Sequence, residues 1–121
     1  MVVVPVLPQD SMSGHVLDFL AYLEFERGLS RNTLDAYRSD LQQFGAFLER
    51  AEVGVLQARH DQLAGWMDEL AAGSEEKPAV APATLQRKAA CLRSFYRHLR
   101  RDGIIDHDPT ADLRSPRKSQ K

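Results

Sequence analysis

The sequence has a single cysteine and no long apolar run, and each absence excludes a class of protein. One cysteine among 121 residues, Cys91, cannot form a disulfide within the chain or build a zinc–thiolate site, so we expect a reducing, cytoplasmic environment. The apolar start of the chain, MVVVPVLP at residues 1–8, is too short to span a membrane and contains two prolines. With 43% hydrophobic and 27% charged residues, the chain is expected to fold as one globular domain.

The formal net charge of −1 hides a difference between two parts of the chain. Residues 1–83 hold 6 basic and 13 acidic residues, a net charge of −7. Residues 84–121 hold 10 basic and 4 acidic residues, a net charge of +6. This asymmetry makes the C-terminal third the place to look for a surface that meets a polyanion.

Apolar residues recur every three or four positions along most of the chain, which predicts helices and no strands. The first helix is expected over residues 14–27, with a buried stripe that includes Leu17, and a second helix should begin after the N-cap Ser30. Further helices are expected over 61–72 and 84–102, separated by a Pro-rich acidic loop at 73–82. Asp108 followed by proline predicts one more helical turn at 108–113. The expected fold is an all-α, four-helix bundle with this short C-terminal helical turn.

The helix expected over 84–102 gathers arginines on one side. At about 100° per residue from Leu85, its apolar residues lie within about 80°, and five arginines lie between about 60° and 200°. These are Arg87, Arg93, Arg97, Arg100 and Arg101. Guanidinium groups suit phosphate oxygens and the edge of guanine, and a helix fits the major groove of DNA. The alternative is a solvated surface, but such surfaces usually mix charges of both signs, and here Asp102 is the sole acid at the end of the helix.

No set of residues predicts a catalytic or metal site. The four histidines show no repeated metal-ligand spacing and are expected at the surface; they are His15, His60, His98 and His107. Asp108 is explained as a helix cap rather than as a metal ligand with Asp106. Cys91 borders an apolar stripe, which predicts a packed thiol rather than a nucleophile. We therefore expect no cofactor, no metal and no self-contained active site, and no phosphate-binding loop motif is present.

Two parts of the chain resemble the N-terminal, core-binding domain of tyrosine recombinases of the XerC/XerD type, within the phage-integrase family. The first is SRNTLDAYRSDL at residues 30–41. The second comprises Arg87, Arg93, Phe95, Tyr96 and Leu99, followed by GII at 103–105, DPTADL at 108–113 and SPR at 115–117. The resemblance extends over nearly all of residues 13–118. It departs at Val80–Thr84, where the family commonly has a Ser/Thr-rich helix start, so the residue that caps this helix stays open.

The resemblance implies a SAM-like orthogonal bundle that forms half of a clamp around double-stranded DNA. It also implies that a separate C-terminal domain performs the chemistry without a cofactor, so this chain itself is expected to be no enzyme. Accordingly, residues 1–12 are expected to be a disordered tail, 13–114 the DNA-binding domain and 115–121 the start of a linker to an absent catalytic domain. The implied partners are a DNA recombination site and other recombinase protomers, identical or paralogous.

Residues that match the family's DNA-contacting positions lie on the second and fourth expected helices. The first choices are Asn32, Thr33, Arg38, Arg87 and Arg93. The second choices are Arg31, Gln42, Thr84, Lys88 and Arg97. Two other classes of function remain open. A helical protein-interaction module would dock a partner on an apolar or acidic surface, and a small enzyme would need a nucleophile–base pair that the sequence does not offer.

Overall fold

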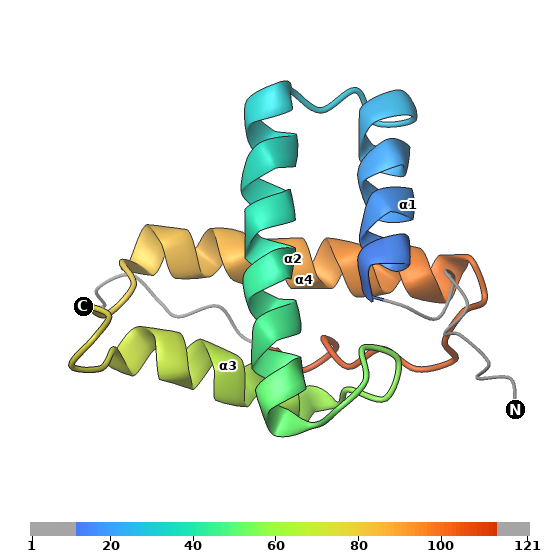
Figure 1. Cartoon of the computed structure of the whole chain (residues 1–121). Helices are drawn as coiled ribbons and strands as arrows, with labels where there is room; N and C mark the ends of the chain where they lie inside the picture. Colours follow the sequence, from blue (N-terminus) through green and yellow to red (C-terminus); the bar gives the residue numbers. More distant parts are fainter. Residues whose placement is uncertain (1–11, 114–121) are drawn as a thin grey trace, which may run out of the picture.

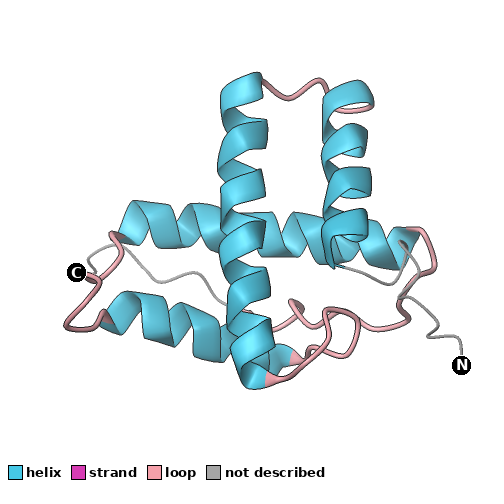
Figure 2. Ribbon diagram, in the orientation of Figure 1, coloured by secondary structure: helices cyan, strands magenta, loops and turns pink. Residues whose placement is uncertain are grey.

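The computed structural model describes residues 12–113, which fold into four α-helices and their connections (Figures 1 and 2). These are α1 (Met12–Phe25), α2 (Arg31–Ala51), α3 (His60–Ala72) and α4 (Pro82–Arg101). The all-helical prediction is confirmed, and no strand occurs in residues 12–113. Met12, expected in the N-terminal tail, is the first residue of α1. The expectations for residues 1–11 and 114–121 lie outside the described part of the chain.

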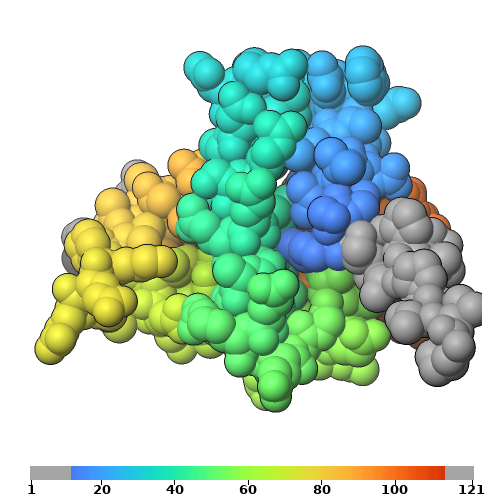
Figure 3. Space-filling view, in the orientation of Figure 1, coloured from blue at the N-terminus to red at the C-terminus, as the bar shows by residue number. Residues whose placement is uncertain are grey.

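The helices form two pairs that cross. In Figure 1, α1 and α2 stand side by side, while α3 and α4 run across α2. Every helix touches at least two others, and α4 contacts the other three. The space-filling view shows α1 and α2 packed together over one face of the molecule (Figure 3). This arrangement agrees with the orthogonal bundle that we expected.

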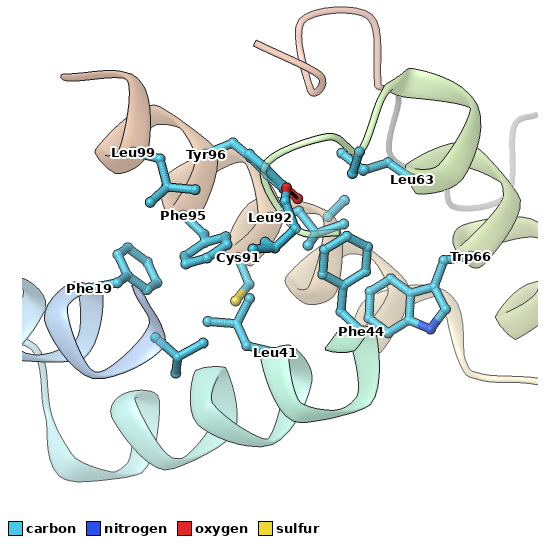
Figure 4. Close-up of a cluster of buried hydrophobic side chains, with 14 of the residues drawn as sticks. Phe19, Leu41, Phe44, Leu63, Trp66, Cys91, Leu92, Phe95, Tyr96 and Leu99 are labelled. Atoms are coloured by element: carbon cyan, nitrogen blue, oxygen red, sulfur yellow. Dashed lines mark hydrogen bonds between the residues drawn. The ribbon is translucent and has the colours of Figure 1, made fainter. Parts of the chain in front are cut away.

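The core lies where the four helices meet, and aromatic rings fill its centre. Phe19 from α1 packs edge-on against Phe95 from α4, with ring centroids 5.4 Å apart. Phe44 from α2 lies 5.2 Å from Trp66 of α3, and Figure 4 shows these side chains converging. Tyr96 is fully buried, and its hydroxyl donates a hydrogen bond of 2.8 Å to the Val55 carbonyl. That bond offsets the cost of burying the hydroxyl group.

The ends of the helices follow local sequence signals closely. Ser30 caps α2, because its hydroxyl accepts a hydrogen bond from the Thr33 backbone N–H at 3.2 Å. The α1–α2 turn passes through Gly28 at φ +67°. α4 begins two residues before the expected start, because Pro82 occupies its first turn, where a missing N–H costs nothing. Ala81 is its N-cap and supplies no side-chain hydrogen bond.

Two local expectations need correction. Leu17 belongs to the apolar pattern of α1 but is 65% exposed, since α1 presents Val16, Phe19, Leu20 and Leu23 to the core instead. The segment 108–113 forms hydrogen-bonded turns rather than an assigned helix. Asp108 does cap these turns, because its carboxylate accepts bonds from the backbone N–H and hydroxyl of Thr110 at 2.9 and 2.6 Å.

Candidate nucleic-acid interface

α4 carries a row of exposed arginines, which we call the α4 arginine row. It consists of Arg87, Arg97, Arg100 and Arg101, all exposed. The helix contains no Asp or Glu from Pro82 to Arg101. The first and last members are fourteen positions apart, so the row extends for about 21 Å along the helix axis at 1.5 Å per residue. Arg93, the fifth arginine of the expected face, is partly buried.

The ten predicted contact residues differ widely in exposure. Arg31, Asn32, Gln42, Arg87 and Arg97 are exposed, and Thr33, Arg38, Thr84 and Arg93 are partly buried. Lys88 is 3% exposed, so its ammonium group is not on the surface. A helical wheel already indicates this, because Lys88 lies about 60° from Leu85 on the apolar side of the helix.

Lys88 and Arg87 both bind Asp40, a buried residue in the middle of α2. The two oxygens of Asp40 accept bonds from Arg87 Nε at 3.0 Å and Arg87 Nη2 at 2.6 Å. Lys88 Nζ donates to Asp40 Oδ1 at 2.8 Å and to Gln43 Oε1 at 2.9 Å. We call this group the Asp40 junction. It fixes the crossing of α2 and α4 by two cations and one carboxylate.

The Asp40 junction leaves one of its cations partly accessible. The side chain of Asp40 is 2% exposed and that of Lys88 is 4% exposed, whereas Arg87 is 41% exposed. The hydrogen bond to Asp40 raises the pKa of Arg87 above its usual value. Arg87 therefore has a fixed direction and still presents part of its guanidinium group to solvent. Asp40 is not among the contact residues predicted from the sequence, although its position beside the apolar stripe of α2 indicates a residue near the core.

The predicted contacts on α2 point to two different sides of that helix. Asp40 faces α4, and Thr33 lies seven residues earlier, within about 20° of it around the helix. Arg38 lies two residues before Asp40 and so about 160° away from it. Arg38 and Gln42 instead line a groove of about 700 Å³ between α1 and α2. Arg38 also bonds to the neighbouring Asp35 at 3.2 Å.

Cys91 and the histidines show where the sequence expectations hold and where they are wrong. Cys91 is fully buried as expected, and burial raises its thiol pKa, which keeps it protonated. His15 and His98 are 2% and 5% exposed, so the expectation of surface histidines is wrong for both. His98 lies against Phe19 and Tyr22 of α1, where its ring contributes to the packing. None of the helices within residues 12–113 is long and apolar enough to cross a membrane.

Comparisons with known proteins agree with this architecture. Residues 16–103 match the family model described as the phage integrase, N-terminal SAM-like domain. Tyrosine recombinase XerD of Lacticaseibacillus casei is 35% identical over 118 residues, covering 90% of this chain and 35% of the relative. Tyrosine recombinase XerC of Roseiflexus castenholzii is 36% identical over 107 residues, covering 88% of this chain and 32% of the relative.

The chain thus spans about a third of the length of these relatives. No solved structure shows a significant match to it. The family model covers most of the described helices, from Val16 in α1 to the glycine that follows α4. The chain belongs to the phage-integrase family of N-terminal, SAM-like domains.

Proposed function

We propose that this chain binds double-stranded DNA as the N-terminal domain of a tyrosine recombinase, with the α4 arginine row against the duplex. The relatives that it matches are named tyrosine recombinases XerC and XerD. The strand-transfer chemistry belongs, in this proposal, to the portion of those relatives that the chain does not span. The recombination site and the other protomers assembled on it are the partners.

The observation that carries the proposal is the set of exposed arginines on α4, a helix that itself contains no acidic residue. Four exposed arginines share a helix without a single carboxylate. A helix of this kind fits the major groove, which is about 12 Å wide, while guanidinium groups bind phosphates or guanine edges. Thr33 begins α2 on the side that faces α4, and the exposed Asn32 lies about 80° from that side. Both join Arg87 in the contact surface that we propose.

The remaining contact residues receive different roles. Arg31, Arg38 and Gln42 share the other side of α2, so we expect smaller effects from their substitution. Arg93 is partly buried, and its substitution combines a binding effect with a packing effect. Lys88 is left out of the contact surface, because removing its ammonium group from Asp40 would leave a buried carboxylate with one cation fewer.

The test is a titration of fluorescein-labelled duplex DNA, followed by anisotropy at several salt concentrations. If roughly five phosphates are neutralised, log K falls against log salt with a slope of about −4 to −5. Arg97→Ala should weaken binding and reduce the steepness of this dependence by about 1. The double variant Arg97→Ala/Arg100→Ala should reduce it by about 2.

The matched control is Arg50→Ala. It also removes one arginine charge, but from the last turn of α2. Arg50 is exposed and pairs with Glu69 of α3 at 2.8 Å, so its removal should leave DNA binding nearly unchanged. No DNA binding by the native chain at low salt, or equal weakening by the control and by Arg97→Ala, would contradict the proposal. Arg87→Ala is less suitable, because it also changes the Asp40 junction.

A second candidate function, protein interaction, is favoured by one feature of α1. Leu17 and Phe25 are 65% and 78% exposed, although both are large and apolar. Large apolar side chains that are exposed to water can become covered in a contact with another protein. Substituting Leu17→Ser/Phe25→Ser should weaken assembly with other protomers on DNA while leaving single-domain DNA binding unchanged. Loss of DNA binding in this variant would contradict a separate role for α1.

A further inference from the structure

Three side chains of types that bind metal ions lie close together where α1 packs against the end of α4. Asp18 comes from α1, His98 from the last turns of α4, and Asp102 caps α4. Their donor atoms all lie within 4.8 Å of one another. Both carboxylates are exposed, whereas the imidazole is buried. The DNA-binding proposal gives none of these three residues a role.

His98 supplies the second, independent observation. The residue is 5% exposed, and Nε2 has no hydrogen-bond partner among the residues that the structure describes. Nε2 lies 3.5 Å from Asp102 Oδ2, which is longer than a good hydrogen bond. Leaving a buried polar atom without a partner destabilises the fold, so the position of this nitrogen beside two carboxylates requires an explanation.

The distance between His98 Nε2 and Asp102 Oδ2 suits a small divalent cation. Zinc binds nitrogen and carboxylate oxygen at about 2.0–2.2 Å in a tetrahedral arrangement, which places neighbouring ligand atoms about 3.3–3.6 Å apart. The observed 3.5 Å between His98 Nε2 and Asp102 Oδ2 falls in this range. Residues four positions apart on a helix face the same side, so α4 offers these two ligands together. Asp18 provides a third ligand from α1.

We propose that Asp18, His98 and Asp102 bind a divalent transition-metal ion of the zinc type, which fastens α1 to the end of α4. One imidazole and two carboxylates leave a fourth position for water. Mg²⁺ is a poorer occupant, because it prefers an octahedral shell of oxygen atoms and gives up its water reluctantly.

The surroundings of His98 both favour and oppose this ion. His98 is buried and offers a ring nitrogen within 4.8 Å of an oxygen of each carboxylate, which favours the ion. Arg101 opposes the ion by its charge, and its Nη2 lies 3.4 Å from His98 Nδ1. Metal binding at Nε2 requires the proton on Nδ1, facing that donor. Arg101 also stacks on Tyr22 at 4.5 Å, a contact that can hold it when the imidazole changes tautomer.

The experiment uses the native chain after treatment with EDTA and dialysis, titrated with zinc chloride by calorimetry. We expect saturable binding of one ion per chain and a melting temperature several degrees higher at saturating zinc, because the ion binds the folded state. Magnesium chloride at the same concentration should change neither measurement. Cobalt chloride should give the visible absorption bands of a nitrogen–oxygen site without thiolate charge transfer.

Variants then assign the site. Asp18→Asn and Asp102→Asn replace exposed carboxylates, so the fold should persist while zinc affinity falls by at least about tenfold. Arg101→Ala should increase zinc affinity, because it removes both the opposing charge and the donor beside Nδ1. The matched control is Asp106→Asn, since Asp106 also lies 3.5 Å from a histidine, His107, but is not part of the three-ligand group.

Several results would overturn the proposal. Failure of the native chain to bind one zinc ion, or equal zinc affinity in Asp18→Asn and the native chain, overturns the proposal. Zinc binding that disappears in Asp106→Asn but persists in Asp102→Asn overturns it as well. In ¹⁵N spectra of the imidazole groups, zinc should shift the Nε2 signal of His98, and shifts confined to His60 or His107 would contradict the assignment.

Discussion

Asp40 joins two helices through one carboxylate. Its oxygens accept three hydrogen bonds from Arg87 and Lys88 while the residue itself is 1% exposed. The attraction of two cations offsets the cost of burying the charge only as long as every partner stays in place. Asp40 is buried and thereby fixes the direction of Arg87, which we expect to contact DNA.

The Asp40 junction leads to a prediction about stability. Asp40→Asn leaves the ammonium group of Lys88 buried without a matching negative charge, so we expect a loss of about 3 kcal/mol in the free energy of unfolding. Urea denaturation followed by circular dichroism measures this loss. Asp35→Asn is the control, because Asp35 forms an exposed pair with Arg38 and should cost less than about 1 kcal/mol. Equal losses in both variants would contradict the role given to the junction.

His98 leads to a prediction about pH. Burial lowers its pKa in the folded state, Arg101 acts in the same direction, and Asp102 and Asp18 act against it. The unfolded chain therefore binds more protons once the pH falls below about 6.5, the ordinary value for histidine. The stability that depends on neutral His98 is complete above that pH and is lost as the pH falls toward the folded-state pKa.

Thermal unfolding between pH 7.5 and 5.5, in the presence of EDTA, should show this loss in the native chain. His98→Gln should show a weaker pH dependence over the same interval, because the titrating group is gone. His60→Gln, which changes an exposed histidine, should follow the native curve. A native chain whose stability rises on acidification through this interval would contradict the sign that we derive.

At the scale of the elements, the sequence predicts the helices well because each one has a strong apolar period and a local stop signal. The C-terminal ends near Gly28, Gly73 and Gly103 are examples, and all three glycines adopt positive φ. Contacts between helices were harder to predict. Asp18 and His98 lie 80 positions apart in the sequence, and only the packing of α1 on α4 brings them together.

Exposure within a helix was predicted less completely than the helix itself. The wheel of α4 identifies four exposed arginines correctly, but Lys88 was assigned from the family pattern against its apolar position. Leu17 fits the apolar spacing of α1, yet it lies at the edge of the side that the helix turns toward the core and stays exposed. The apolar repeat of a helix predicts which residues form its apolar stripe. Tertiary packing decides which of the residues at the two edges of that stripe are buried.

The α3–α4 connection leads to a prediction about one glycine. Gly73 adopts φ +72°, and a Cβ atom there would lie 2.5 Å from the backbone nitrogen of Ala79. We expect Gly73→Ala to cost about 2–3 kcal/mol, because strain and a backbone clash add. Gly28→Ala is the matched control, since Gly28 has a similar φ of +67° and nothing within 4 Å of the added atom, and should cost about 1 kcal/mol. Equal losses by urea denaturation would contradict the close approach.

At the scale of the whole molecule, charge and exposed apolar area lie on different helices. The α4 arginine row is cationic, while α1 exposes Leu17 and Phe25. In our proposal, the domain contacts DNA through α4 and another protomer through α1. The sequence predicted the cationic surface from composition, whereas the apolar one emerged only from the packing of α1.

The proposed division of labour predicts the behaviour of the isolated chain. Incubation with a nicked duplex that carries a recombination site should give DNA binding but no covalent protein–DNA adduct. Its three tyrosines are buried or partly buried. Burial raises the pKa of Tyr96 and of Tyr37. Denaturing gel electrophoresis with labelled DNA measures the adduct, and a band that resists detergent and depends on any of the tyrosines would contradict the prediction.

The Asp40 junction has a mechanical consequence. Arg87 and Lys88 are adjacent on α4, and both bind Asp40 at the middle of α2. A force applied to one helix is therefore transmitted to the other. If the chain binds DNA as proposed, a force that the duplex exerts on α4 would move α2 with it instead of sliding one helix over the other.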